Sequence, residues 1–370
     1  MKEYYRDLQS VCAAIGPLNE GAMEEARARQ AMLAKPPGSL GRLEELSVQL
    51  AGITGHIFQD LKHKHLLVFA ADNGVAEEGV SSAPQSVTLM QAINLTRGKT
   101  GAATMASHFG ARLTVVDAGI NGQVPACGIV NEKIAWGTKD LYLEPAMRRE
   151  QAVASLLVGV NTACRAAAAG ADVLGVGEMG IGNTTTSSAM LAAFTGAAPE
   201  AVTGRGGGLT DAGYEKKLAV IRTALQKHKP DPADPIDVLA KVGGFELGAM
   251  AGAFLGAAAC RMPVVIDGFC SMVSALCAYR LCPGVRGYLF PSHASFEIGS
   301  TLAAKELHLH PLFDLSMRLG EGSGCLLAFE ILSAAAAVLT HMATFAEAEI
   351  DDAYLADIRK GDAFTPGVRA

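Results

Sequence analysis

A carboxylate stands inside a glycine turn late in the chain, at residues 318–324 (RLGEGSG). Glycines on both sides leave Glu321 without side-chain cover, so its carboxylate can project into a pocket. There it could serve as a general base, a group that takes a proton from a reacting atom. The alternative is an acid that complements the dipole of the apolar helix expected from Cys325 onward. We take Glu321 as the leading catalytic candidate.

Two earlier glycine-rich stretches could hold a phosphate. Residues 177–186 (GEMGIGNTTT) lead from an apolar run into a helical one, so glycines would let the backbone approach a ligand and the helix start would offer N–H groups to an anion. Within this stretch, the negative charge of Glu178 would repel a bound anion. A carboxylate at this position is therefore unfavourable unless it has a function of its own. Residues 204–210 (GRGGGLT) precede Lys217, a cation that could complete the cradle. A plain tight turn and a mobile surface loop are the respective alternatives.

Other polar residues and the motifs that are missing narrow the reaction class. Asp267, His293 and Ser295 lie near expected strand ends, where a single His or Ser more often makes a local hydrogen bond than takes part in chemistry. The chain contains no Ser-His-Asp order, no His-Glu-x-x-His and no Gly-x-x-x-x-Gly-Lys-Ser/Thr pattern. Serine hydrolase, zinc peptidase and P-loop NTPase are therefore disfavoured.

Composition and charge restrict the partners. The formal net charge of −6 comes without a basic block, which disfavours a nucleic-acid binder. Charged residues near the N-terminus stand where a signal peptide needs its apolar segment, so we expect a cytoplasmic protein. The eight cysteines lack CxxC spacing, so neither a disulfide framework nor a metal site is expected. Arg261 and Pro263 interrupt the apolar stretch 247–266, and Glu330 interrupts 325–342, so we expect both in the core and none in a membrane.

Short apolar runs that each end in an acid or a small polar residue indicate a parallel sheet. Continuous Val, Ile and Leu runs separated by Ala-rich helical segments are typical of a sheet covered by helices on both faces. We therefore predict a doubly wound, Rossmann-like α/β domain over residues 60–300. Helical spacing predicts a small helical domain built from residues 1–59 plus 301–370. Ligands of such sheets bind beyond the carboxyl ends of the strands, where this chain has Asp72, Asp117, Glu178 and Asp267.

A longer series of motifs runs along the chain in a fixed order. It comprises residues 35–44 (KPPGSLGRLE), 71–75 (ADNGV), 96–101 (TRGKTG), 175–180 (GVGEMG), 242–246 (VGGFE), 267–269 (DGF), 291–293 (PSH) and 318–324 (RLGEGSG). This series resembles that of the nicotinate-nucleotide:dimethylbenzimidazole phosphoribosyltransferases and covers roughly residues 30–350. So many separate motifs in one order make the resemblance far more specific than a single glycine-rich loop.

The resemblance implies a homodimeric, metal-independent enzyme with no cofactor. Such an enzyme converts nicotinate mononucleotide and 5,6-dimethylbenzimidazole, or a related base, to α-ribazole 5′-phosphate and nicotinate, in the nucleotide-loop assembly of cobalamin biosynthesis. By resemblance, Glu321 is the general base and Glu178 the second acid of the site. The ribose phosphate is expected beside Gly180, Gly206, Gly207, Gly208, Lys217, Asp267 and Ser295, and the base beside Ala83, Gln91, Met179 and Leu319.

One position departs from the family pattern, because Ala83 stands where a serine is often found at the edge of the base pocket. The change removes one possible hydrogen bond and hardly alters the volume of the pocket. The accepted base therefore stays open among dimethylbenzimidazole, benzimidazole, adenine and phenols.

Two other function classes stay open. A nicotinamide-dinucleotide oxidoreductase would also use glycines and a parallel sheet, but it needs Gly-x-Gly-x-x-Gly after its first strand. Here the first expected strand leads into residues 72–74 (DNG) instead. The other class is a sensor that binds a benzimidazole or a nucleotide without turnover. Such a sensor would release no nicotinate, and its binding of the base would be unaffected by Glu321→Gln.

Overall fold

The computed structural model describes residues 4–126 and 128–355. Its centre is a six-stranded sheet in the order β3-β2-β1-β4-β5-β6, in which all neighbouring strands run parallel. The doubly wound α/β fold expected from the sequence is thereby confirmed. The strands are β1 (Lys64–Ala71), β2 (Arg112–Gly119), β3 (Val130–Asn131), β4 (Val173–Met179), β5 (Val264–Ile266) and β6 (Leu289–Pro291).

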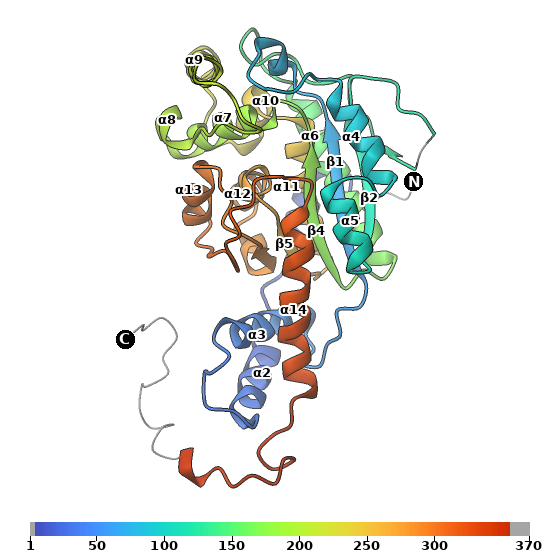
Figure 1. The fold of residues 1–370 in the computed structure, drawn as a ribbon, viewed down its shortest axis with the longest axis vertical. Helices are drawn as coiled ribbons and strands as arrows, with labels where there is room; N and C mark the ends of the chain where they lie inside the picture. The colour runs from blue at the N-terminus through green and yellow to red at the C-terminus, as the bar shows by residue number, and fades with distance from the viewer. Residues whose placement is uncertain (1–3, 127, 356–370) are drawn as a thin grey trace. The chain divides into compact units, whose positions relative to one another are not determined.

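The strand order determines where a ligand can bind. The chain winds outward from β1 to β3 and then returns to the other side of β1 with β4, so that β1 and β4 lie side by side (Figure 1). Their register runs from Lys64 opposite Val173 to Ala70 opposite Met179. The loops that leave these two strands diverge at this point, which is the usual ligand crevice of doubly wound sheets.

Helices cover this sheet. In Figure 1, α11 and α12 lie beside β4 and β5, and α4 and α5 lie beside β2, in agreement with their packing contacts. The helices are α1 (Leu8–Ala14), α2 (Glu20–Met32), α3 (Arg42–Thr54), α4 (Val87–Thr96), α5 (Gly101–His108), α6 (Arg149–Ala168), α7 (Asn183–Thr195), α8 (Pro199–Val202), α9 (Asp211–His228), α10 (Pro235–Val242), α11 (Phe245–Ala259), α12 (Phe269–Leu281), α13 (Gly299–Glu306) and α14 (Ser323–His341), with short 3₁₀ turns at Gly74–Glu78, Pro283–Tyr288 and Ala353–Leu355.

Glycines let α6 and α11 pack backbone against backbone. A Cβ added to Gly159 of α6 would lie 2.6 Å from the backbone nitrogen of Ala253. A Cβ added to Gly252 of α11 would lie 2.9 Å from Cα of Leu156. Packed interiors do not tolerate such overlaps, so both positions require glycine.

Contacts within the chain define two compact units. Among the described residues, the larger unit comprises Tyr4–Gly16 and His63–Ala328, whereas the smaller unit comprises Pro17–Lys62 and Phe329–Leu355. The expected bounds put residues 4–16 and 301–328 in the smaller part and residues 60–62 in the larger part instead. The difference arises because α1 packs against α6 and α11, and because α13 packs against α7, α8 and α12.

The smaller unit is built from helices. α2 packs against α3, and the apolar core of this unit contains Ala22, Ala26, Val48, Ala51 and Leu339. Arg29 of α2 donates from Nε to the carbonyl oxygen of Leu339 at 2.7 Å, which ties α2 to the last turns of α14. An antiparallel bridge joins Leu33 to Thr344.

One helix among the described residues, α14, is long and apolar enough by composition to cross a membrane. More than half of its most apolar stretch is buried inside the protein, and core helices of soluble proteins meet the same test. Its length and composition therefore agree with the core helix expected from the sequence.

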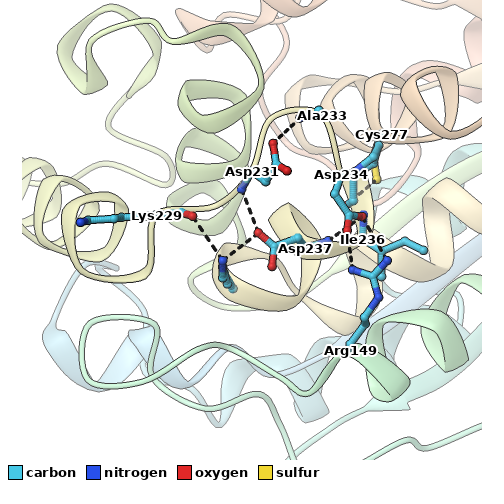
Figure 2. A network of polar contacts seen from close by, with 10 residues as sticks. Arg149, Lys229, Asp231, Ala233, Asp234, Ile236, Asp237 and Cys277 are labelled. Carbon is cyan, nitrogen blue, oxygen red and sulfur yellow. Dashed lines mark hydrogen bonds and ion pairs between the residues drawn. The ribbon is translucent and has the colours of Figure 1, made fainter.

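An exposed polar network joins the start of α6 to the start of α10 (Figure 2). Asp234 caps α10, because its carboxylate accepts two backbone N–H groups of the first turn at 3.1 and 3.2 Å. Two guanidinium nitrogens of Arg149 donate to the same carboxylate at 2.6 and 3.2 Å. Lys241 adds a bond to Asp237 at 2.8 Å. These bonds fasten the connection between α9 and α10 at the surface.

Candidate active site

A cavity of about 190 Å³ opens at the carboxyl ends of β4, β5 and β6. Its walls come from the segments that follow these strands and from the loops at residues 81–83 and 206–207. The predicted site residues in its lining are Ala83, Glu178, Met179, Gly180, Gly206, Gly207, Asp267, Ser295 and Leu319. Four other predicted residues lie outside the lining, namely Gln91, Gly208, Lys217 and Glu321.

Glu178 lies at the end of β4 and lines the cavity with only 8% of its surface exposed. The side-chain amide of Asn183 donates a short hydrogen bond to its Oε2. Burial is the main cause that raises the pKa of Glu178 to about 8, and electrostatic interactions with the neighbouring acids Asp267, Glu246 and Glu321 act in the same direction. The carboxyl therefore carries a proton at neutral pH and can donate a hydrogen bond to a ligand.

Asp267 holds the turn that carries Glu321 in an unusual backbone shape. Gly320, Glu321 and Gly322 have left-handed φ angles of +83°, +62° and +83°. A residue with a side chain rarely adopts this conformation, so the surroundings must support it. The Asp267 carboxylate accepts the backbone N–H groups of Gly322 at 3.0 Å and Gly324 at 2.7 Å. Asp267 thus faces the turn, although it also lines the cavity.

The Glu321 side chain lies beneath the cavity wall. It is 2% exposed, and its Oε2 accepts the backbone N–H of Ala102 in the first turn of α5 at 3.1 Å. The start of a helix favours a negative charge. Leu319 packs beside it, since a Cβ added to Gly101 would lie 2.6 Å from Cδ2 of Leu319 and 3.8 Å from Oε2 of Glu321. Leu319 and Gly320 line the cavity, whereas the neighbouring Glu321 does not.

A buried histidine adjoins the same turn. His293 lines the cavity, and its Nδ1 lies 3.0 Å from Oγ of Ser292 and 4.0 Å from Oδ1 of Asp267. Burial raises the pKa of Asp267, while His293 and the backbone N–H groups of the turn lower it. Ser295 lines the cavity near this point, since a Cβ added to Gly268 would lie 3.6 Å from its Oγ.

The two glycine-rich stretches meet beside the first turn of α7. Lys217 of α9 is fully buried, and its Nζ donates to Oγ1 of Thr184 at 2.8 Å and to the carbonyl oxygen of Gly204 at 3.2 Å. A Cβ added to Gly206 would lie 2.9 Å from Oγ1 of Thr184 and 3.7 Å from Nζ of Lys217. Burial lowers the pKa of Lys217 to about 8. The helix start, the hydroxyl and the ammonium group together offer the kinds of donors that an anion site needs, and we refer to this group as the candidate anion site.

Two charged lining residues were missed by the sequence prediction. Glu297 is 9% exposed, and its charge counteracts the lowering of the pKa of Lys217. Within residues 4–126 and 128–355, its Oε2 has no hydrogen-bond partner. The guanidinium carbon of Arg318 lies over the ring of Phe296, 5.2 Å from the ring centroid. The position of Arg318 beside the glycine turn was a usable signal, whereas Glu297 follows an irregular segment without periodicity.

The predicted base pocket is represented by Ala83, Met179 and Leu319, which all line the cavity. Ser82 lines it next to Ala83, so a hydroxyl is present although position 83 lacks one. Gln91 lies on α4, where its side-chain oxygen accepts a bond from the following turn of the helix at 3.0 Å.

Comparison with known proteins identifies close relatives over most of the chain. The family model described as phosphoribosyltransferase matches residues 15–350. A nicotinate-nucleotide–dimethylbenzimidazole phosphoribosyltransferase of Clostridium perfringens is 49% identical over 357 residues, which are 96% of this chain and 99% of that protein. The protein of the same name from Roseiflexus sp. is 50% identical over 344 residues, which are 93% of this chain and 98% of that protein.

Solved structures agree with these sequence matches. The crystal structure of nicotinate-nucleotide–dimethylbenzimidazole phosphoribosyltransferase from Thermus thermophilus matches with a TM-score of 0.85 at 40% identity, over 90% of this chain and 99% of that one. A second crystal structure from the same organism, described as CobT, matches with a TM-score of 0.86 at 41% identity over the same shares. The chain belongs to the nicotinate-nucleotide–dimethylbenzimidazole phosphoribosyltransferase family.

Proposed function

We propose that this chain transfers the ribose phosphate of nicotinate mononucleotide to a benzimidazole-type base, which activates the lower ligand of cobalamin. One observation carries the proposal. One cavity at the carboxyl ends of the strands is bordered by the acid Glu178, by Thr184 of the candidate anion site and by Gly320 of the glycine turn that carries Glu321. Membership of the family supports the reaction class, and this grouping of an acid with the candidate anion site supports a sugar phosphate as substrate.

The leaving group of the substrate lowers the barrier that the enzyme has to overcome. Nicotinate mononucleotide carries a cationic pyridinium, so its bond to C1′ of the ribose is already weakened. The protein has to hold the incoming base nitrogen on the opposite face of the ribose, which replaces a random encounter by aligned groups. Attack from that face forms the new C1′–N bond with inversion, and nicotinate leaves with the electron pair of the broken bond.

Glu321 takes the proton that the base loses. When one benzimidazole nitrogen bonds to C1′, the N–H of the other nitrogen becomes acidic, and a carboxylate can accept this proton. The bond from Ala102 fixes the Glu321 side chain next to Leu319 and Gly320, which line the cavity. Leu319 is 57% exposed, so a bound base can displace it and reach the carboxylate.

Glu178 responds to the charge of the substrate. Since its pKa is about 8, the free enzyme holds this carboxyl neutral, and it can donate to a ribose hydroxyl. The pyridinium of the bound substrate favours the ionised form, and the proton of Glu178 then passes to the solvent in the cavity before the C1′ bond breaks. The resulting carboxylate stabilises the positive charge that develops on the ribose in the transition state.

The 5′-phosphate binds at the start of α7. The hydroxyl of Thr184 and the ammonium group of Lys217 supply donors, and the glycine loop lets the backbone come close. Gly206 and Gly208 have φ angles of +56° and +116°, which residues with side chains avoid. Ser295 lines the same cavity and contributes a hydroxyl to the ribose phosphate.

We further infer a cytoplasmic homodimer that needs neither metal nor cofactor, as the family resemblance implies. Two large apolar side chains that are exposed next to the cavity lining favour a contact between subunits there, namely Phe296 and Ile298. Light scattering after size-exclusion chromatography should give twice the mass of one chain, and a monomer at all concentrations would refute the dimer.

Incubation with nicotinate mononucleotide and a panel of bases tests the activity. The panel contains dimethylbenzimidazole, benzimidazole, adenine and phenol, and mass spectrometry identifies the products. We expect nicotinate and an α-riboside phosphate in equal amounts. Base binding without nicotinate release would indicate a sensor, and reduction of added NAD by a hydroxy acid would indicate an oxidoreductase; either result would refute the proposal.

A further inference from the structure

A buried acid and a buried amide face each other beneath the candidate site. Glu246 lies in the first turn of α11 and Asn73 follows β1, and neither is exposed. Nδ2 of Asn73 donates to Oε1 of Glu246 at 2.6 Å. In the part of the chain that the structure describes, Oδ1 of Asn73 and Oε2 of Glu246 have no hydrogen-bond partner. Buried polar atoms are nearly always bonded, so these two oxygens require an explanation.

The two oxygens lie on the same side of the pair. A Cβ added to Gly244 would lie 2.6 Å from Oδ1 of Asn73 and 2.7 Å from Oε2 of Glu246. Two acceptors with no donor between them repel each other. One proton on Oε2 removes the repulsion, because the carboxyl then donates to Oδ1 while Oε1 still accepts from Nδ2. Acid and amide thereby close a ring of two hydrogen bonds.

This pair supports the turn that lines the cavity. A Cβ added to Gly180 would lie 2.9 Å from Oε1 of Glu246 and 3.1 Å from Nδ2 of Asn73, so the backbone of Gly180 rests on the pair. The carbonyl oxygen of Gly180 accepts the backbone N–H of Asn183 at 3.1 Å. The side chain of Asn183 in turn binds Glu178. A shift of the pair would therefore move both of these site residues.

We propose that Glu246 and Asn73 are positioning residues, a neutral acid–amide pair with the proton on Glu246 that supports the Gly180 turn and thereby aims Glu178 at the substrate. The inference rests on the proposed function only for what Glu178 is aimed at. The pair itself follows from the two unpartnered oxygens and from the glycines packed against them.

The surroundings of Glu246 favour the protonated form. Burial and the charge of Asp72 raise the pKa of Glu246 to about 7, although the bonds from Asn73 and from its own backbone N–H oppose this rise. Glu178 on β4 and Cys270 on α12 also sense the charge of Glu246. These facing groups are acids and a thiol. A hydrogen bond donated to Oδ1 of Asn73 favours the neutral carboxyl further.

Three variants distinguish a neutral pair from a charged one. Glu246→Gln places two amides opposite each other, which form the same ring of bonds, so kcat/KM should stay within about 3-fold of the wild type. Asn73→Asp places two acids in contact, which cannot both ionise, so kcat/KM should fall about 10²-fold near pH 7. The double variant Asn73→Asp/Glu246→Gln restores an acid–amide pair with exchanged roles and should recover at least about 10-fold of that loss.

Infrared spectroscopy supplies a readout without substrate. The C=O stretch of a protonated carboxyl is separate from the bands of a carboxylate. The difference spectrum between the wild type and Glu246→Gln near pH 6 should therefore contain a protonated-acid band. Glu178→Gln serves as the matched control, because it removes the band of the neighbouring acid and leaves that of Glu246.

Two results would overturn the inference. One is a loss of activity in Glu246→Gln as severe as in Asn73→Asp, with melting temperatures that show both folded. The other is a difference spectrum without a protonated-acid band. If the wild type releases no nicotinate but shows this band, and if the double variant regains the melting temperature lost in Asn73→Asp, the pair stands and the proposed function fails.

Discussion

Two polar clusters of the larger unit differ in how their charges are arranged. The network around Asp234 pairs opposite charges in water, with side-chain exposures of 51% for Arg149 and 35% for Asp234. Glu178, Asp267 and Glu321 instead gather three acids in the interior, each less than a tenth exposed. Exposed ion pairs change stability little, whereas buried like charges disfavour the folded state. The buried cluster therefore indicates function, because stability alone would not retain it.

Among the variants of the buried cluster, replacement of Glu321 should reduce activity most. Glu321→Gln keeps the size of the side chain and removes its ability to take a proton. We expect turnover to fall ~10²–10⁴-fold while the affinity for nicotinate mononucleotide stays unchanged. Steady-state kinetics and titration calorimetry measure the two quantities. Unchanged turnover would leave Glu321 with a structural bond to α5 and no part in the reaction.

Replacement of Asp267 should have the second largest effect on activity, because Asp267 acts indirectly by holding the glycine turn that carries Glu321. Asp267→Asn keeps one acceptor but turns an amide toward the N–H group of Gly322 or Gly324, so the turn loses a bond. We expect kcat/KM to fall about 10²-fold, since a small misplacement of a catalytic group has an effect of this size. Ser292→Ala is the matched control, because it removes the bonds of Oγ to the backbone carbonyl oxygen of Asp267 and to Nδ1 of His293 but leaves both bonds from the Asp267 carboxylate to the turn. Equal losses in both variants would contradict a special role of the carboxylate.

The buried cluster should also make stability depend on pH. The unfolded chain ionises Glu178 near its ordinary pKa of 4.5, whereas the folded chain keeps this proton until about pH 8. The folded state thus binds more protons, and its stability falls as pH rises through this window. Between pH 6 and pH 8 the wild type should lose about 2 kcal/mol more than Glu178→Gln. Chemical denaturation at several pH values measures this, and parallel curves for both proteins would refute it.

The surface network should give the smallest effects. Asp234→Asn keeps the helix cap and removes the charge, so the free energy of unfolding should fall by less than about 0.5 kcal/mol. Asp234→Ala also removes the cap and should lower it by about 1 kcal/mol. Added salt should abolish the first difference and leave the second. A loss above about 2 kcal/mol in Asp234→Asn would show that exposure had been a poor guide to the strength of this pair.

The location of the site could be predicted from the sequence for a physical reason. Apolar runs that end in Glu178 and Asp267 are strands of one parallel sheet, and the carboxyl ends of such strands share one edge. The glycine stretches around Gly180 and Gly206 follow the same logic, since both needed a backbone without side chains near a ligand. Local patterns therefore sufficed to bring these residues to one cavity.

The direction of individual side chains could not be predicted in this way. Asp267 is predicted to lie beside the ribose phosphate, and nothing in the sequence indicates that its carboxylate also bonds to a turn 55 residues later in the chain. Asn73 and Glu246 are 173 positions apart, and only the packed fold shows that they share a hydrogen bond. Such contacts depend on how the helices pack against the sheet, and this packing cannot be predicted from the periodicity or the spacing of residues in the sequence.

The left-handed backbone at Glu321 lowers the stability of the fold at a residue that activity requires. A glycine at this position would relieve roughly 1–2 kcal/mol of steric strain, because only a residue without Cβ adopts a φ of +62° freely. Selection for heat resistance alone would thus drift toward glycine at position 321 and yield a durable but inactive protein. Libraries for hardier versions of this enzyme should be screened for turnover and melting temperature together.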